Sequence, residues 1–272
     1  MNLTFIGGGN MAQAIIGGLR ARQVGRKGKI VVVDPHPGAR AKVAKLGATA
    51  LAALEARRGP LGDLVVLAVK PQAMREACLD LRRFLKAEPV LSIAAGMPLE
   101  AIGRWLGGHA RLARCMPNTP ALVGAGVSGV FARPAVTAAQ RKRVEAVLGA
   151  VGSVVWVGDE ALLDPITAVS GSGPAYVFYF IEALRDAAIG MGLEARAANQ
   201  LAIETFLGAA RLARRGDEDV AVLRERVTSK GGTTEAALRV LADERLAERF
   251  RRAVEAARRR SVELGATLGK DA

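Results

Sequence analysis

The sequence is poor in the residues that most catalytic and metal sites use. It contains two histidines, His36 and His109, and two cysteines, Cys78 and Cys115. The histidines lie in loop-like surroundings and the cysteines are far apart, so the spacings typical of a zinc site, a disulfide framework or a histidine-based triad are missing. We therefore expect no metal ion, and the chemistry must come from other residues.

Long apolar runs are also missing. No stretch approaches the roughly 20 consecutive apolar residues that a membrane-spanning helix needs, because Arg, Glu, Asp or Gly interrupts each candidate. The opening MNLTFIGGGNM lacks the basic start and the long apolar segment of a secretory signal, and it is typical of a strand and a turn. We therefore predict a soluble, cytoplasmic protein with no membrane partner.

Acidic and aromatic residues are scarce beside an excess of arginine and lysine. Aromatic residues make up 4% of the chain and the formal net charge is +13, which raises the possibility of nucleic-acid binding. The arginines gather mainly in helix-like stretches at 211–215 and 248–260, where they alternate with an apolar stripe as on a solvated helix face. We therefore predict no nucleic-acid partner, and a regulator that binds DNA is kept as an alternative.

The first part of the chain alternates short β-rich runs with helical stretches. This alternation is typical of βαβ units and predicts an α/β Rossmann-type domain, a doubly wound and mainly parallel sheet, over residues 1–160. The expected strands are LTFI (3–6), KIVVVD (29–34), LVVLAV (64–69), PVLSIA (89–94), ARLARC (110–115), GVSGVF (126–131) and SVVWV (153–157).

No convincing strand follows Asp159. Long helical stretches separated by glycines and short polar turns predict a second, all-helical domain over residues 161–272. The expected helices span about 174–191, 195–215, 217–227, 234–241 and 246–264.

A glycine-rich turn separates the first expected strand from the first helix. FIGGGNMAQAIIGGL contains Gly7-x-Gly9-x-x-Ala12, in which Gly7 permits a tight turn and Gly9 lets a pyrophosphate approach the backbone. Ala12 keeps the helix close to the strand, and the helix N-terminus faces the phosphates. With a second strand following at 29–34, this motif predicts a dinucleotide coenzyme.

The second expected strand ends in Asp34, at the position where a carboxylate usually binds the adenosine ribose and repels a 2′-phosphate. Asp34 therefore favours NADH. His36 and Arg40 follow closely and could pair with a 2′-phosphate, so NADPH stays open at this point. Asp34 could also be a plain turn former.

Two further loops follow strands of the first domain. AVKPQ (68–72) and MPNTP (116–120) come after the strands at 64–69 and 110–115. Ligands of open α/β sheets bind beyond the carboxyl ends of the strands, so we expect both loops to flank the nicotinamide end of the coenzyme. Alternatively, each proline only shapes its loop.

Two glycine-containing segments stand before helices of the second domain. In VSGSGPAYVF (169–178), Pro174 suits a first helical turn and Ser172 is placed to cap it. The apolar helix that follows predicts burial against a partner subunit. TSKGGTT (228–234) repeats the arrangement, and we expect both helix openings to form a small anion pocket suited to a carboxylate.

Together these motifs resemble pyrroline-5-carboxylate reductase, and the resemblance runs the whole length of the chain in order. The segments that carry it are FIGGGNMA, AVKPQ, SIAAG, MPNTPALVGAG, VSGSGPAYVFYFIEAL and TSKGGTTEAAL. The resemblance implies NAD(P)H-dependent reduction of 1-pyrroline-5-carboxylate to L-proline. It also implies that the helical domain binds substrate and interlocks with its twin in a homodimer, which often assembles further into a decamer of five dimers.

Site residues are implied by position. Gly7, Gly9, Asn10 and Met11 match the coenzyme phosphate loop, Lys70, Pro71 and Asn118 match loops on the coenzyme side, and Ser229, Gly231, Gly232, Thr233 and Thr234 match the substrate loop. Of these, Ser229 and Thr234 are the implied catalytic residues, with the Thr234 hydroxyl near the ring nitrogen. Lys230 departs from the family pattern and is expected to face solvent. Asp34 also departs, because the family often prefers NADPH and carries small polar residues there.

A β-hydroxyacid dehydrogenase is the competing enzyme class, since it shares the design of a Rossmann domain followed by helices. Such an enzyme uses a helical lysine as acid or base. The second domain offers only Lys230 and Lys270, and neither falls within an expected helix. The sequence therefore favours the reductase.

Overall fold

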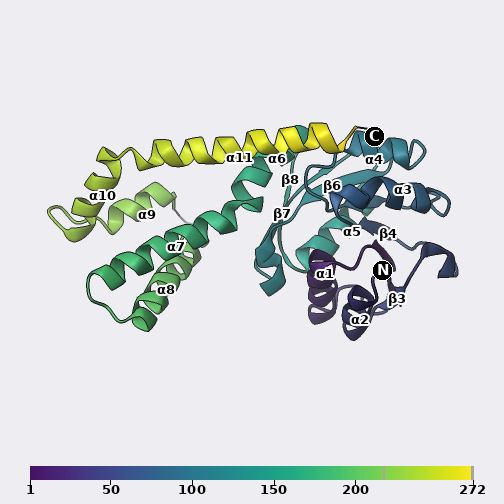
Figure 1. The fold of residues 1–272 in the computed structure, drawn as a ribbon, viewed down its shortest axis with the longest axis horizontal. Coiled ribbons are helices and arrows are strands. Elements are labelled where there is room, and N and C mark those ends of the chain that lie inside the picture. Colours follow the sequence, from purple (N-terminus) through teal and green to yellow (C-terminus); the bar gives the residue numbers. More distant parts are fainter. Residues whose placement is uncertain (217, 271–272) are drawn as a thin grey trace. The chain divides into compact units, whose positions relative to one another are not determined.

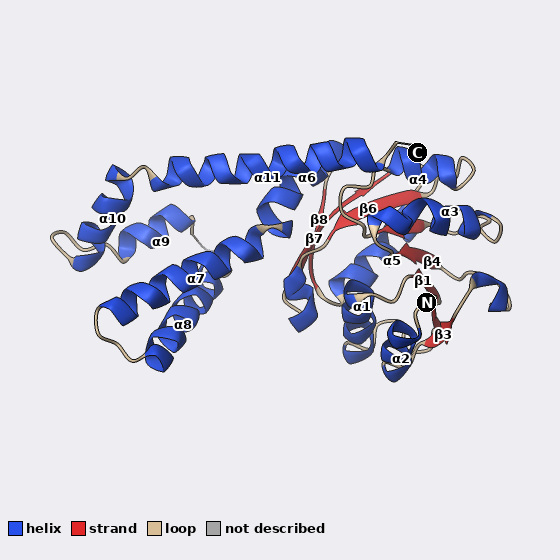
Figure 2. Ribbon diagram, in the orientation of Figure 1, coloured by secondary structure: helices blue, strands red, loops and turns tan. Residues whose placement is uncertain are grey.

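The computed structural model of the chain describes residues 1–216 and 218–270 (Figure 1). Its first part contains an eight-stranded sheet in the order β3-β2-β1-β4-β5-β6-β7-β8 (Figure 2). Every neighbouring pair is parallel except β6 with β7. The strands are β1 Leu3–Ile6, β2 Ile30–Val33, β3 Thr49–Leu51, β4 Leu64–Leu67, β5 Val90–Ser92, β6 Leu112–Met116, β7 Gly126–Ala132 and β8 Gly152–Trp156.

Helices alternate with the strands up to β8, and after β8 the regular elements of the described chain are helices. The α-helices of the described chain are α1 Asn10–Ala21, α2 Pro37–Lys45, α3 Met74–Arg82, α4 Leu99–Trp105, α5 Ala138–Gly149, α6 Leu163–Ile166, α7 Gly173–Gly190, α8 Ala195–Ala213, α9 Val220–Arg226, α10 Thr233–Asp243 and α11 Leu246–Leu268. Short 3-10 turns lie at Leu54–Ala56, Pro71–Ala73, Thr119–Val123 and Glu160–Leu162, and a π-helix lies at Thr167–Gly171. None of the helices in the described ranges is long and apolar enough to span a membrane.

The sheet is covered on both faces, which explains its apolar strands. β2 reads IVVV and β4 reads LVVL, because a strand buried on both sides has no polar face. Neighbouring residues point to opposite faces, so Phe5 joins one core cluster with residues of α1 and α5, while Ile6 joins the other with residues of α3 and α4. The predicted doubly wound fold is therefore confirmed.

All seven expected strands are present, with ends shifted by a few residues. The eighth strand, β3, was not predicted from the sequence. This strand has three residues, Thr49–Leu51, at the edge of the sheet beside β2. A run of three residues carries too little alternation to be recognised. The expected helix at 217–227 corresponds to α9, and residue 217 lies outside the described residues.

The chain folds into two compact units. The first comprises Met1–Ser172 together with the chain from Ala257 onward, and the second comprises Gly173–Ala256. Residues just after 160 join the first unit because Leu163 is fully buried there and because the Ser261 hydroxyl donates a hydrogen bond of 2.6 Å to the Asp164 carboxylate. The boundary drawn from the sequence at residue 160 thus falls inside the first unit, and the domain ranges built on it stay a prediction.

The second unit contains an aromatic cluster and an exposed apolar face. The rings of Tyr176 and Phe180 on α7 both lie within 6 Å of the Phe250 ring on α11, at centroid distances of 5.6 and 5.7 Å. On the same helix, Phe178 and Tyr179 are 65% and 67% exposed. Large aromatic side chains left in water on a helix indicate a surface that pairs with another protein.

An ion pair ties the start of the second half to the sheet. The Arg114 guanidinium of β6 lies 2.9 Å from the Glu160 carboxylate, and their side chains are 8% and 25% exposed. The same carboxylate oxygen of Glu160 accepts the Leu99 N–H at the start of α4, at 2.8 Å. Glu160 therefore joins β6 and α4 through one oxygen atom.

We expect Glu160→Gln to lower the free energy of unfolding by about 1–3 kcal/mol, because it leaves a buried guanidinium without its counter-charge. Urea denaturation at a fixed protein concentration measures the loss. The matched control is Glu263→Gln, since Glu263 pairs with Arg260 at the same distance of 2.9 Å but with both side chains exposed. The control should change stability by less than about 1 kcal/mol, and equal losses would contradict the structural role of Glu160.

Candidate active site

The glycine-rich turn after β1 leaves the N-terminus of α1 open. Gly7 has a φ of +99°, and a Cβ there would lie 2.7 Å from the backbone carbon and oxygen of Ala68, so only glycine fits. Gly9 is the N-cap of α1. Within the described chain no side chain caps this helix, and a Cβ on Gly9 would meet nothing within 4 Å. The turn therefore places open space in front of uncapped helical N–H groups, which suits a phosphate.

Of the three residues that follow the glycine turn, one faces solvent and two pack against the core. Asn10 is exposed at the first position of α1, and Met11 is half-buried against the core. Ala12 is 1% exposed, so the helix packs closely on the sheet at this point. The small side chain of Ala12 thus has the packing role that the motif predicts.

Asp34 fastens the turn to the end of β2. It is 7% exposed, and its carboxylate accepts the Gly8 N–H at 2.7 Å and the His36 N–H at 2.8 Å. The nearby Arg40 guanidinium donates instead to the backbone oxygens of Asp34 and Pro35, at 2.9 and 2.7 Å. The Asp34 carboxylate therefore lies directly beside the glycine turn. The guanidinium of Arg40, the nearest arginine, is already hydrogen-bonded to two backbone carbonyl oxygens.

A pocket of about 250 Å³ opens at the carboxyl ends of β1, β2 and β4. Its apolar walls include Ile6, Val33, Pro35, Val69, Ala73 and Ala77, and Glu55, Glu76 and Asp80 also line it. A mostly apolar pocket beside the end of β2 suits the adenine of a dinucleotide. The pocket and the glycine turn thus lie at the same edge of the sheet.

Lys70, Pro71 and Asn118 lie in loops at this edge. Lys70 is exposed and begins the short turn Pro71–Ala73, directly after Val69 of the pocket. Asn118 is 8% exposed, and its side-chain oxygen accepts the Val127 N–H at 2.9 Å. Asn118 therefore holds the loop after β6 against β7, a structural role that its place in the sequence did not predict.

α7 begins at Gly173, so Pro174 lies in its first turn as predicted, but the open, Ser172-capped helix end expected at SGSGP is absent and that part of the prediction is wrong. Ser172 has helical dihedral angles, φ −85° and ψ −20°, and its N–H donates to the Thr167 oxygen at 2.8 Å. A π-helix, Thr167–Gly171, precedes α7 directly, so Ser172 does not cap a helix. Gly171 has a packing reason instead, because a Cβ there would lie 2.5 Å from the Cε of Met116.

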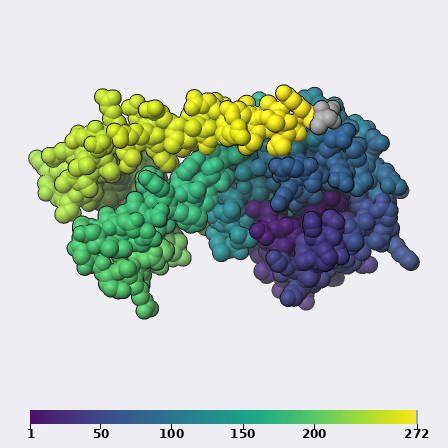
Figure 3. Space-filling model, viewed as in Figure 1, coloured from purple at the N-terminus to yellow at the C-terminus, as the bar shows by residue number. Residues whose placement is uncertain are grey.

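The second expected opening, at TSKGGTT, is present at the start of α10. Gly231 has a φ of +74°, which favours glycine, and Gly232 is the N-cap of the helix with extended backbone. Ser229, Lys230 and Thr233 are exposed, while Thr234 is half-buried. Figure 3 shows the yellow-green part of the chain that contains this loop at the surface of the second unit. Among the described residues, the N–H groups of Thr233 and Thr234 have no hydrogen-bond partner. Free N–H groups at a helix N-terminus can bind a carboxylate.

Sequence reasoning missed Glu235 in this loop. Its carboxylate accepts the Gly231 N–H at 2.6 Å, and the Gly232 N–H donates to the Ser229 oxygen at 3.0 Å. Glu235 is the third residue of α10, from which a carboxylate commonly reaches back to the chain before the helix. The sequence feature that could have identified this contact is a glutamate three residues after the N-cap Gly232.

Known proteins resemble the chain over its whole length. Pyrroline-5-carboxylate reductase of Pseudomonas aeruginosa is 44% identical over 269 residues, which cover 98% of both chains. The chain belongs to the pyrroline-5-carboxylate reductase family. The family profile described as pyrroline-5-carboxylate reductase dimerisation matches residues 160–264, and one described as NADP oxidoreductase, coenzyme F420-dependent, matches residues 2–96.

Solved structures of the pyrroline-5-carboxylate reductase family share the fold. The reductase of Coxiella burnetii superimposes with a TM-score of 0.91 at 41% identity, over 97% of this chain and 98% of that one. The reductase of Plasmodium falciparum, whose structure holds NADP, gives a TM-score of 0.83 at 27% identity with the same coverage. The predicted family is therefore confirmed, and with it the class of NAD(P)-dependent oxidoreductases.

The residues of the first unit fit the reductase family's dinucleotide coenzyme. A Cβ at Gly7 would strike the backbone, the space before Gly9 is open, and an apolar slot lies at the end of β2. Gly7, Gly9, Asn10 and Met11 would hold the phosphates, Asp34 the adenosine ribose, and the slot the adenine. The predicted residues of the substrate loop, 229–234, all lie in the second unit.

Neither cysteine offers a reactive thiolate. Burial raises the pKa of Cys78 to about 12, and it also raises the pKa of Cys115, so both thiols stay protonated at neutral pH. The described residues contain no group of three or more His, Cys, Asp or Glu side chains that could hold a metal ion.

Proposed function

We propose that this chain reduces 1-pyrroline-5-carboxylate to L-proline with a coenzyme held at the glycine turn and a substrate held by residues 229–234. The open N-terminus of α10 is the observation that carries the proposal. There, no side chain caps the helix at Gly232, and the N–H groups of Thr233 and Thr234 are free to receive the substrate carboxylate, whereas those of Gly231 and Gly232 are bonded within the loop.

The proposed reduction requires no strong acid or base among the side chains. The substrate is a cyclic imine, and when its nitrogen is protonated the imine carbon is already a strong electrophile. NAD(P)H supplies a hydride to that carbon, and the nitrogen keeps its proton as a secondary amine. The chain needs only to orient the ring and exclude water, with the Thr234 hydroxyl contacting the ring nitrogen and Ser229 shaping the loop. A chain with two histidines and two buried cysteines can meet these needs.

NADH is the coenzyme that this site favours. The buried Asp34 carboxylate stands where an adenosine ribose would lie, and it can accept hydrogen bonds from ribose hydroxyls but repels a 2′-phosphate. Arg40, the nearest candidate for pairing with that phosphate, donates to two backbone carbonyls. NADPH is expected to bind, but less tightly.

The match to the dimerisation profile of the family supports a homodimer. The exposed apolar face of α7 is the surface that we propose to contact the second copy. Val177, Phe178 and Tyr179 are 44%, 65% and 67% exposed on that helix, and a dimer would remove them from water. A decamer of five dimers is the further assembly that we propose on the resemblance, and a cytoplasmic location stays a prediction. Sedimentation at several protein concentrations measures the assembly.

Steady-state assays of the purified protein test the proposed reaction. We expect 1-pyrroline-5-carboxylate to cause oxidation of NADH or NADPH and to be converted to L-proline, identified by mass spectrometry. A panel of 3-hydroxy acids with NAD⁺ or NADP⁺ tests the competing dehydrogenase, and we expect no turnover. Binding to random DNA that weakens with salt, without turnover of any imine, would support the regulator instead.

A further inference from the structure

The loop after β5, residues 93–98, lies at the edge of the sheet where the coenzyme is proposed to bind. β5 stands between β4 and β6, so this loop lies between the loops that carry Lys70 and Asn118. Asp34 and the adenosine half of the coenzyme belong to the β2 side of the glycine turn, which leaves the side of β4 and β5 for the nicotinamide half. The reduction described above assigns no role to this loop.

The β5 loop is hydrogen-bonded to its surroundings near its two ends. The Ile93 N–H donates to the Leu67 oxygen of β4 at 3.1 Å, and the Leu99 N–H donates to the Glu160 carboxylate at 2.8 Å. Within the described residues, no hydrogen bond joins the middle of the loop, 95–97, to a residue outside it. The position of this middle part therefore depends on what packs against it.

The last turns of α11 supply that packing. Gly96 is buried and has a φ of +71°, and a Cβ there would lie 3.6 Å from the Cδ1 of Leu268. In the other direction, a Cβ on Gly265 would lie 3.1 Å from the Gly96 oxygen, and one on Gly269 would lie 3.3 Å from the Cγ of Pro98. Two glycines four residues apart on α11 thus let the helix approach the backbone of the loop closely.

Further contacts fix the end of α11 in place. Leu268 packs against the core cluster to which Ala94 and Met97 of the loop belong. The Arg104 guanidinium of α4 donates to the Gly269 oxygen at 3.1 Å, and Figure 1 shows the yellow end of α11 beside α4. α11 begins in the second unit, but this end of the helix and the β5 loop both belong to the first unit.

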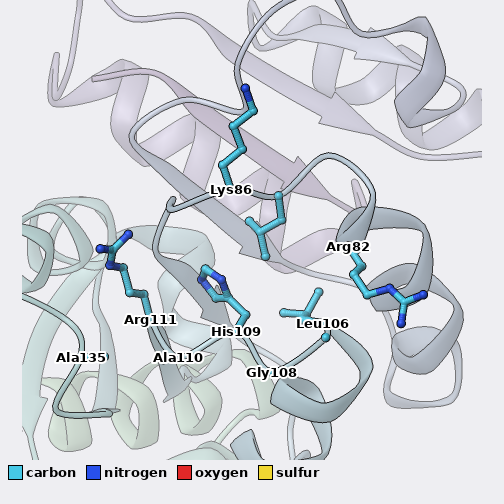
Figure 4. A pocket seen from close by; sticks show the side chains of 10 residues that line it. Arg82, Lys86, Leu106, Gly108, His109, Ala110, Arg111 and Ala135 are labelled. Atoms are coloured by element: carbon cyan, nitrogen blue, oxygen red, sulfur yellow. The ribbon is translucent and has the colours of Figure 1, made fainter.

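The opposite end of β5 is open. The loops that lead into β5 and β6 border a depression of about 730 Å³ (Figure 4). The charged ends of Arg82, Lys86 and Arg111 point away from one another there, and Arg111 donates to the Ala87 oxygen at 2.7 Å. The labelled side chains thus form no convergent set, and packing by a segment distant in sequence is a feature of the coenzyme edge of β5.

We propose that the end of α11, residues 264–269, positions the β5 loop against the nicotinamide half of the coenzyme, with Leu268 and Gly265 as positioning residues. The inference rests on the coenzyme site proposed above. Hydride transfer requires the imine carbon within about 3–3.5 Å of the nicotinamide, so a small displacement of a loop that contacts the ring affects binding and reaction. The α11 residues act through the loop and touch neither coenzyme nor substrate.

Two ligands that differ in the nicotinamide ring test the proposal by calorimetry. NADH carries the ring and ADP-ribose lacks it. We expect Leu268→Ala to weaken NADH binding by at least about fivefold and ADP-ribose binding by less than about twofold, because the loop contacts only the nicotinamide half. Leu268→Met keeps an apolar side chain of similar volume and should restore the affinity for NADH. The matched control is Val262→Ala, which truncates a side chain on the same helix that is 45% exposed and should change neither affinity.

Gly265→Ala decides the question if Leu268→Ala does not fold. Its Cβ would lie 3.1 Å from the Gly96 oxygen, so the loop must shift, whereas alanine favours the helix itself over glycine. We expect the same selective loss of NADH affinity without a loss of stability to urea. An equal change for both ligands would show general support of the fold, and no change for either would show no support of the loop. Both results would overturn the proposal.

Failure of the coenzyme site gives a different result. If the unmodified protein binds neither NADH nor ADP-ribose, the coenzyme site is wrong and this inference falls with it. If it binds both and the variants do not separate them, only the role of α11 is wrong. The measurements use no turnover, so they are independent of the proposed substrate.

Discussion

Thr234→Ala is expected to lower kcat/KM for 1-pyrroline-5-carboxylate by about 5-fold to 150-fold, while leaving the affinity for the coenzyme nearly unchanged. Thr234 is half-buried in the first turn of α10, and its hydroxyl is the group proposed to contact the ring nitrogen. Losing a buried polar partner costs about 1–3 kcal/mol, which corresponds to this range of rates. Initial rates over a range of substrate concentrations at saturating coenzyme measure the effect.

Two further variants separate chemistry from folding. Thr234→Ser keeps a hydroxyl and should recover most of the activity, whereas Thr234→Val keeps the size of threonine and should behave as alanine does. Coenzyme affinity, measured by quenching of protein fluorescence, should stay within twofold in all three variants. A simultaneous collapse of coenzyme affinity would contradict the assignment of Thr234 to the substrate.

Asp34→Asn is expected to reduce the preference for NADH over NADPH by at least about tenfold. The carboxylate repels a 2′-phosphate, and two unit charges 4 Å apart interact by about 4 kcal/mol at an effective dielectric constant of about 20. A tenfold change requires only about 1.4 kcal/mol. Asparagine keeps one oxygen for the Gly8 N–H and turns its NH2 toward the His36 N–H, so it loses one of the two backbone hydrogen bonds of Asp34. The free energy of unfolding of the variant is therefore measured beside its coenzyme preference. The ratio of kcat/KM for the two coenzymes is the quantity to measure.

The matched control for this test is Asp80→Asn, because Asp80 also lines the adenine slot but comes from α3. It removes the same charge away from the end of β2, so the coenzyme preference should change much less. If the unmodified enzyme prefers NADPH by tenfold or more, the proposed role of Asp34 is wrong. In that case Arg40 would have to leave the two backbone oxygens that it contacts.

Local patterns predicted the glycine turn before α1 because the interactions that form it are local. Gly7 and Gly9 lie in the tight turn between β1 and α1, as the sequence predicts, and their proposed role in holding the phosphates rests on the same few residues. Gly231 and Gly232 before α10 follow the same logic. Glycine at a helix start can be recognised without knowing what packs against it.

The SGSGP segment shows where local reasoning fails. A serine and a proline before an apolar run are typical of a helix start, yet Ser172 continues from a π-helix and Gly171 makes room for Met116 of a distant strand. Asn118 is similar, because its side-chain oxygen accepts the N–H of Val127 on the neighbouring strand β7. Neither contact leaves a periodic signal in the sequence.

By itself the sequence determined seven of the eight strands, the long helices, the mainly parallel sheet and the two glycine-containing turns, since these follow from apolar periodicity and from backbone conformations that favour glycine. The family followed from the resemblance of the motifs in order along the chain. The tertiary structure alone decided that the Asp34 carboxylate accepts the Gly8 N–H, that Glu160 pairs with Arg114, and which of the two expected helix openings is open. Gly8 and Asp34 are 26 residues apart and Arg114 and Glu160 are 46 residues apart, so these contacts form only when the fold brings the residues together. Side-chain hydrogen bonds and charges act only over a few ångströms.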